Sequence, residues 1–176
     1  MTYKLIKDFN LLANKKLLIW LNIWGIVVFI SLLIFGAFYF VVSSLSINFL
    51  AMFLFFVTFF LILIIHELIH GLFFKLFKPE AKVKFGFKSG VAYATSPGSI
   101  YPKHQFIIVC LMPFVLITLL LCGLYLLGVN GIFLYFLFAM HTGGCVGDFY
   151  FFYLLLKQKD GTHVEDTEQG FKLYKQ

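Results

Sequence analysis

Residues 61–74 read LILIIHELIHGLFF, and this stretch decides which kind of fold the chain can adopt. It is an apolar run that contains two histidines, His66 and His70, and one glutamate, Glu67. Such a run is typical of a helix that crosses a membrane, because the hydrocarbon core takes about 20 helical residues. Ionisable side chains are costly at that depth, so their presence there points to a function.

The rest of the chain is similarly apolar. Of its 176 residues, 61% are hydrophobic and 12% are charged, and a soluble domain of this length could not bury so much apolar surface. Each of four long apolar blocks predicts one transmembrane helix: residues 17–42, 49–77, 104–128 and 131–157. The first block exceeds the roughly 7–15 apolar residues of a signal peptide, so we expect an uncleaved helix.

The connection between the second and third blocks, residues 78–103, has a pattern of its own. Within it, KVKFGFKSGVAYAT (82–95) alternates apolar and polar residues around Ser89 and Gly90, which predicts a short β-hairpin. The polar tail, residues 158–176, is expected to be an ordered or fraying end without a function of its own. The sequence therefore predicts an all-α integral membrane protein, a single membrane domain with four transmembrane helices and one cytoplasmic β-hairpin.

The basic residues predict the orientation in the membrane. All 14 are lysines, and they lie before the first block, between the second and third, or after the fourth. The positive-inside rule then places both termini and the 78–103 connection in the cytoplasm of a multi-pass cell-membrane protein. The net charge of +6 is mainly a topology signal, with some attraction to anionic lipid. Nucleic-acid binding is a poor interpretation, because the lysines border the membrane.

The spacing of HELIH indicates a metal site. His66 and His70 are four residues apart, so on a helix they lie on one face, about 40° apart around the axis. Glu67 is rotated by about 100° from His66, which suits a base acting on water better than a ligand. This HExxH arrangement has that meaning in zinc hydrolases, and we predict Zn²⁺ at His66 and His70 with Glu67 as base.

A catalytic zinc site has three protein ligands and an open position for water, so a third ligand is required at the same depth. Of the eight acidic residues, only Glu67 and Asp148 lie inside apolar blocks. Asp148 is about 9 residues from the cytoplasmic end of its block, and the histidines are about 11 and 7 residues from theirs. At 1.5 Å per residue these depths coincide, and Asp148 is the favoured third ligand.

Two neighbours compete with Asp148. His141 lies on nearly the same face but about 10 Å closer to the outside, and Cys145, one turn from Asp148, is chemically a good zinc ligand. Without such an accessory role, His141 is expected to hydrogen-bond to the bundle or to substrate. Cys145, like Cys110 and Cys122, would then be a small packing residue, since thiols inside helices do not indicate a disulfide framework.

Three glycines surround the candidate third ligand in HTGGCVGD, residues 141–148. Gly143, Gly144 and Gly147 allow close helix approach and weaken the helix locally. Both effects predict that this segment lies tight against the second helix.

These motifs together resemble the intramembrane zinc metalloproteases of the site-2 protease type. The closer resemblance is to DUF3267, a family of small bacterial membrane zincins of unknown function. It is carried by HELIHG (66–71), the KFGF and YAT stretch (84–95), Pro113 and the GD pair (147–148), and it spans most of residues 60–155.

The resemblance implies His66, His70 and Asp148 as zinc ligands and Glu67 as the catalytic base. It also implies that strands within 82–95 hold a substrate extended for cleavage, which strand addition would achieve. The chain departs from the fuller site-2 proteases in two respects: Asp148 is followed by Phe149, without their asparagine-proline-aspartate-glycine block, and no PDZ-like domain is present.

The function that the sequence predicts is intramembrane zinc-dependent hydrolysis of peptide bonds near the cytoplasmic leaflet. The expected partners are a membrane protein or peptide substrate and the lipid bilayer. An alternative from another class is a metal-dependent membrane binding or scaffold protein that retains the zincin site without cutting. Metal transport is disfavoured, because the ionisable groups form one cluster at one depth.

Overall fold

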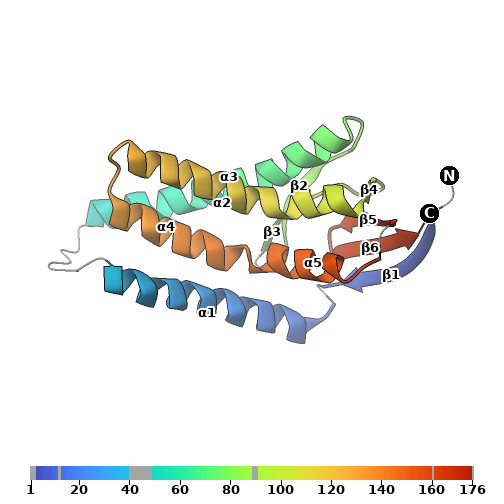
Figure 1. Cartoon of the computed structure of the whole chain (residues 1–176), viewed down its shortest axis with the longest axis horizontal. Helices are drawn as coiled ribbons and strands as arrows, with labels where there is room; N and C mark the ends of the chain where they lie inside the picture. The colour runs from blue at the N-terminus through green and yellow to red at the C-terminus, as the bar shows by residue number, and fades with distance from the viewer. Residues whose placement is uncertain (1–2, 12, 40–48, 89–90, 160, 176) are drawn as a thin grey trace.

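The apolar blocks form the helices of a bundle in the computed structural model, which describes residues 3–11, 13–39, 49–88, 91–159 and 161–175. The helices run side by side along the long axis of the molecule (Figure 1). They are α1 (Lys15–Tyr39), α2 (Phe49–Phe77), α3 (Lys103–Leu126), α4 (Gly131–Gly144) and α5 (Val146–Leu156). The bounds of α2 are those predicted, whereas the predicted end of the first helix at residue 42 lies outside the described residues.

Three of these helices, α1, α2 and α3, are long and apolar enough to cross a membrane. The pair α4 and α5 makes a fourth span if it is counted as one helix, but it bends by 47°. The sequence had predicted one continuous helix over residues 131–157. The structure instead has two helices there, so this prediction is wrong. The break falls at Cys145, among glycines that weaken a helix.

A four-stranded antiparallel sheet lies at one end of the bundle, and the sequence analysis did not predict it. Its order is β1-β6-β5-β4. The strands are β1 (Lys4–Asn10), β4 (Ile100–Pro102), β5 (Thr162–Thr167) and β6 (Gly170–Lys175). The all-α prediction is thus incomplete, because the tail of residues 158–176 contributes two strands to a packed layer.

An apolar core joins this sheet to the helices. Val164, Phe171 and Leu173 are completely buried on its inner face. They belong to one cluster with Phe74 of α2 and Phe106 of α3. Because buried apolar side chains contribute about 1.5–3 kcal/mol each, this cluster fixes β5 and β6 against the helix ends.

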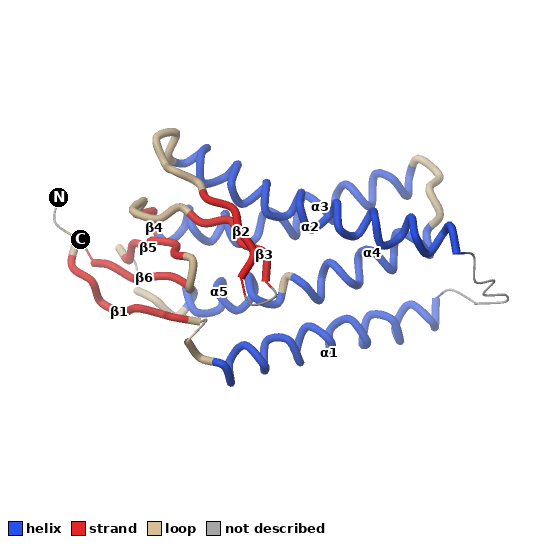
Figure 2. Tube along the Cα trace, turned by 180° about the vertical axis from the view of Figure 1, so that it is seen from behind, coloured by secondary structure: helices blue, strands red, loops and turns tan. Residues whose placement is uncertain are grey.

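The two strands predicted within residues 82–95 are present as a separate antiparallel pair, β2 (Lys84–Lys88) and β3 (Val91–Thr95). Figure 2 shows this pair set apart from the four-stranded sheet. The predicted turn at Ser89 and Gly90 lies outside the described residues. The pair packs on α2 at Gly71, where a Cβ atom would lie 2.5 Å from the end of the Phe85 ring, so a larger residue there would displace that side chain.

Helices α1 and α4 make backbone contact at two facing glycines. A Cβ atom on Gly25 would lie 2.8 Å from the carbonyl oxygen of Gly143, and one on Gly143 would lie 2.7 Å from that of Gly25. Small residues permit this approach between membrane helices. The segment does lie against the second helix, as predicted, through His141 and Asp148, which contact His66, while Gly143 itself faces the first helix.

Replacing Gly143 with alanine should destabilise the protein by about 1–3 kcal/mol, because the methyl group would force the two backbones apart. The thermal unfolding midpoint in detergent micelles would measure the effect. Gly144→Ala is the matched control, since a Cβ atom there meets nothing within 4 Å. Equal midpoints for the two variants would contradict the close contact.

Candidate metal centre

Three residues singled out from the sequence meet at one point inside the bundle. The Nε2 atoms of His66 and His70 are 3.1 Å apart. The carboxylate of Asp148 places Oδ2 3.1 Å from His66 Nε2 and Oδ1 3.5 Å from His70 Nε2. Both histidines are buried, at 8% and 7% exposure. Helix α2 supplies the histidines, and the first turn of α5 supplies the carboxylate.

These spacings fit a tetrahedral zinc ion. Zinc binds histidine nitrogen and carboxylate oxygen at about 2.0–2.2 Å, so neighbouring ligand atoms of a tetrahedron lie roughly 3.3–3.5 Å apart. The three measured separations, 3.1, 3.1 and 3.5 Å, are close to this range. Three protein ligands leave one position free for water or substrate, as in catalytic zinc sites.

The surrounding structure holds the ligands in place. His70 Nδ1 lies 2.9 Å from the carbonyl oxygen of Val109, a distance at which this nitrogen donates and directs Nε2 toward the site. The break at Cys145 gives α5 a helix N-terminus of its own, with Asp148 in its first turn. The positive end of the helix dipole there favours a carboxylate.

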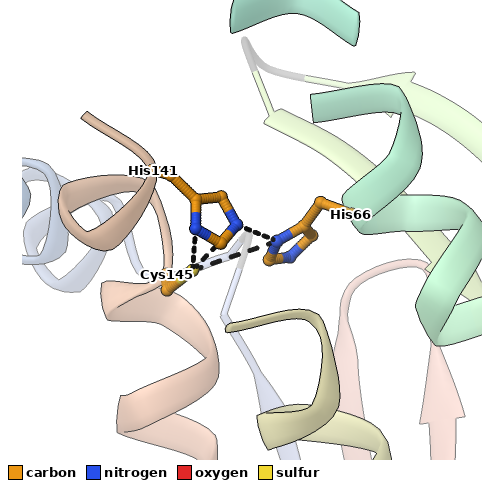
Figure 3. A group of neighbouring side chains, drawn as sticks. All are labelled: His66, His141 and Cys145. Carbon is orange, nitrogen blue, oxygen red and sulfur yellow. Dashed lines mark hydrogen bonds between the residues drawn. The ribbon is translucent and has the colours of Figure 1, made fainter. Parts of the chain in front are cut away.

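A second group of donor atoms lies on the other side of His66. His66 Nδ1 is 3.1 Å from His141 Nε2 and 3.9 Å from Cys145 Sγ, and that sulfur is 3.5 Å from His141 Nε2. Figure 3 shows these three side chains, with His66 on α2 facing the other two. His141 and Cys145 are 1% and 0% exposed. By residue type and spacing this group, too, could hold a metal ion.

The two groups share His66, and one arrangement uses both of its ring nitrogens. If Nε2 faces the metal, Nδ1 donates to His141 Nε2, just as Nδ1 of His70 donates to a carbonyl. His141 is then a positioning partner for His66, and its ring stacks on Phe114 at an interplanar angle of 7°. Asp148 stays the predicted third ligand, and His141 and Cys145 keep the accessory place that the sequence analysis gave them.

Replacing His141 with alanine should weaken zinc binding by about 10- to 100-fold, the usual effect of losing the hydrogen-bond partner of a zinc-bound histidine. At saturating zinc the content should stay at one ion per chain. A competitive chelator titration would measure the affinity, with His104→Ala as control because His104 is exposed at the start of α3. A fall in zinc content at saturation would instead make His141 a ligand.

The site opens into a cavity of about 580 Å³. Glu67, only partly buried, lines this cavity beside both histidines and Asp148. The backbone of Ala94 interacts with the Glu67 carboxyl group, which places β3 directly beside the predicted base. Residues of α1, α3, α4 and α5 and the turn between β5 and β6 also contribute to the lining.

Two acidic residues of this cavity, Asp166 and Glu168, were not predicted from the sequence. Asp166 was assigned to an aqueous tail, but it lies on the inner face of β5, is 7% exposed, and lines the cavity. Burial raises the pKa of its carboxyl group to about 8, and the side chain of Thr95 only partly opposes this rise. The side chains of THVEDT, residues 162–167, alternate between buried and half-buried. Only Val164 among them is apolar, so the sequence did not show a strand pattern there.

The other two histidines, His104 and His163, belong neither to the cavity lining nor to the two groups of metal-binding candidates among the described residues. His104 is exposed. His163 of β5 is half-buried, and its ring lies 5.1 Å from that of Tyr3.

Comparison with protein families gives a match over residues 59–163 to DUF3267, which is described as "Putative zincin peptidase". A search of curated proteins gives no match, and neither does a search of solved structures. The matched range holds the HELIH half of α2, the strands β2 and β3, and the segment that carries Asp148. Since it covers more than half of the chain, the protein belongs to the DUF3267 family.

Proposed function

We propose that this protein is a zinc metalloprotease of the site-2 protease type, which hydrolyses peptide bonds of membrane-associated substrates near the cytoplasmic leaflet. One observation carries the proposal. His66, His70 and Asp148 converge with zinc-like spacing beside Glu67, in a cavity between helices apolar enough to cross a membrane.

Two histidines and one aspartate would hold the ion. A bound zinc ion supplies a Lewis acid that polarises the scissile carbonyl group and lowers the pKa of water toward about 7. Glu67 accepts the proton of the attacking water while the oxygen adds to the carbonyl carbon. The same carboxyl group then returns the proton to the amide nitrogen as the C–N bond breaks, so an amine and a carboxylic acid leave, and the acid then gives up its proton to the amine or to solvent.

The strand β3 is well placed to present a substrate. Ala92, Tyr93 and Ala94 line the cavity, and among the described residues β3 pairs only with β2. Its other edge can therefore pair with an extended segment, which exposes a peptide bond that a helix would hide. The interaction between Ala94 and Glu67 places that edge next to the base.

The distribution of lysines supports a cytoplasmic position for the site. Lys15 begins α1, Lys75 lies in the last turn of α2, and Lys103 begins α3. Figure 1 shows these helix ends at the end of the bundle that carries the four-stranded sheet. By the positive-inside rule this end faces the cytoplasm.

Purified protein in liposomes, mixed with bacterial membrane proteins, should produce new N-termini within or next to membrane-spanning segments. Mass spectrometry of labelled N-termini would identify them. A zinc chelator should abolish these cuts and added zinc should restore them, because the proposed chemistry needs the ion. Cuts that persist in chelator would come from another protease. A substrate that is retained on the protein but never cut would favour the scaffold alternative.

A further inference from the structure

The cavity at the metal centre is acidic, although the protein as a whole is basic. The chain carries 14 lysines and a net charge of +6. Among the described residues that line the cavity, none is a lysine, and the carboxylates are Glu67, Asp148, Asp166 and Glu168. The proposed hydrolysis uses the first two. Asp166 and Glu168 therefore have no role in it.

These two carboxylates lie together at the sheet end of the cavity. Both come from β5 and the turn that follows it, with Thr167 between them. Asp166 is 7% exposed and makes no ion pair with any described lysine. Glu168 is more open, and its carboxylate lies 3.7 Å from Lys84 Nζ, a pair whose side chains are 41% and 61% exposed. Such an exposed pair is weak and easily exchanged.

A buried carboxylate without a cation is unfavourable, because burial removes water from the charged form. The raised pKa of Asp166, about 8, reflects this. A cation that enters the cavity within about 4–6 Å would favour the ionised form and relieve the penalty. Among the described residues no lysine pairs with Asp166, so a positive group brought by a substrate would relieve this penalty.

We propose that Asp166 and Glu168 bind a lysine or arginine side chain of the substrate, on the cytoplasmic side of the bond that is cut. This inference rests on the proposed protease function. Membrane segments carry an excess of lysine and arginine at their cytoplasmic edge, so a segment held at the metal centre presents such a side chain toward the sheet. Asp166 and Glu168 lie outside residues 59–163, the range that the family match covers.

Binding can be tested apart from cleavage with synthetic membrane-spanning peptides in zwitterionic nanodiscs. The peptides would share one apolar segment and differ only in the cytoplasmic flank: a pair of lysines, of glutamines or of glutamates. The protein would carry Glu67→Gln to prevent cleavage, and fluorescence transfer would report affinity. Further variants would add Asp166→Asn or Glu168→Gln, with Glu80→Gln as control, since Glu80 is exposed and lies outside the cavity lining.

The lysine-flanked peptide should bind at least about tenfold more tightly than the glutamine-flanked one, as expected for a charged hydrogen-bonded pair. Asp166→Asn should remove most of this preference, Glu168→Gln part of it, and Glu80→Gln none. Glu168→Lys, an exposed change that spares folding, should favour the glutamate-flanked peptide. Equal binding of the lysine and glutamine peptides, or a preference that survives both neutral variants, would overturn the proposal.

The net charge of the protein provides an internal check. Nonspecific attraction to a chain of charge +6 would favour the glutamate-flanked peptide, the opposite of the expected order. The proposed function can fail separately. If the wild type prefers the lysine-flanked peptide but cuts none of the peptides, the cation site is supported and the protease function is ruled out. If it cuts all three peptides equally well, the protease function is supported and the cation site is ruled out.

Discussion

Glu67→Gln should leave the zinc content unchanged and lower the cleavage rate by about 10²- to 10⁴-fold, the usual contribution of a general base. Glutamine keeps the size of the side chain but cannot accept a proton at the pH of the assay. Glu67 belongs to neither group of metal-binding candidates among the described residues, so the ion should stay in place. Zinc analysis and cleavage of one membrane substrate, measured on the same preparation, would show both effects.

The matched control for this experiment is Glu80→Gln, which makes the same chemical change at an exposed position outside the cavity. It should retain both zinc and full activity. Undiminished cleavage by Glu67→Gln, in a preparation free of other proteases, would show that Glu67 is not the base. Loss of zinc from Glu67→Gln would instead indicate that the glutamate helps to bind the ion.

Asp148→Ala should weaken zinc binding by more than the roughly 10- to 100-fold expected for a partner of a ligand. The remaining histidines supply two of three ligands, and alanine also removes the negative charge that faces both Nε2 atoms. Cleavage should be undetectable at zinc concentrations that saturate the wild type. Equilibrium dialysis against buffered zinc would measure the affinity.

The same measurement separates the two groups of donor atoms. Cys145→Ala should keep zinc if Asp148 is the third ligand, because the sulfur then only packs beside His66. If zinc instead stays in Asp148→Ala and is lost from Cys145→Ala, the ion belongs among His66, His141 and Cys145. The circular dichroism of each variant would confirm that a loss of zinc is not a loss of fold.

The metal-site candidates were accessible from the sequence because two simple rules apply inside a membrane. Helical spacing places His66 and His70 on one face, and the cost of buried charge makes every intramembrane carboxylate conspicuous. Comparing depths along two helices then selected Asp148. The structure brings these three residues together, while their role as ligands stays a prediction.

The four-stranded sheet was not predicted, because only its β5–β6 hairpin is a local pairing. The tail shows a strand pattern in GFKLYK, but its polarity and its place after the last apolar block hid that signal. The outer partner of β6 is β1, which the sequence places before the first helix. Local periodicity carries no information about such a distant partner. Asp166 was overlooked because it lies in this polar tail, outside every apolar block.

The pairing of β1 with β6 also has a consequence for biosynthesis. Ribosomes make the N-terminal segment first, yet Lys4 pairs with Lys175 and Asn10 with Gly170. The turn before β6 also accepts a hydrogen bond from the backbone of Leu11, and both Leu11 and that turn line the cavity. The cavity wall therefore closes only after translation of nearly the whole chain, so a nascent or truncated chain carries HELIH without a finished cavity around it.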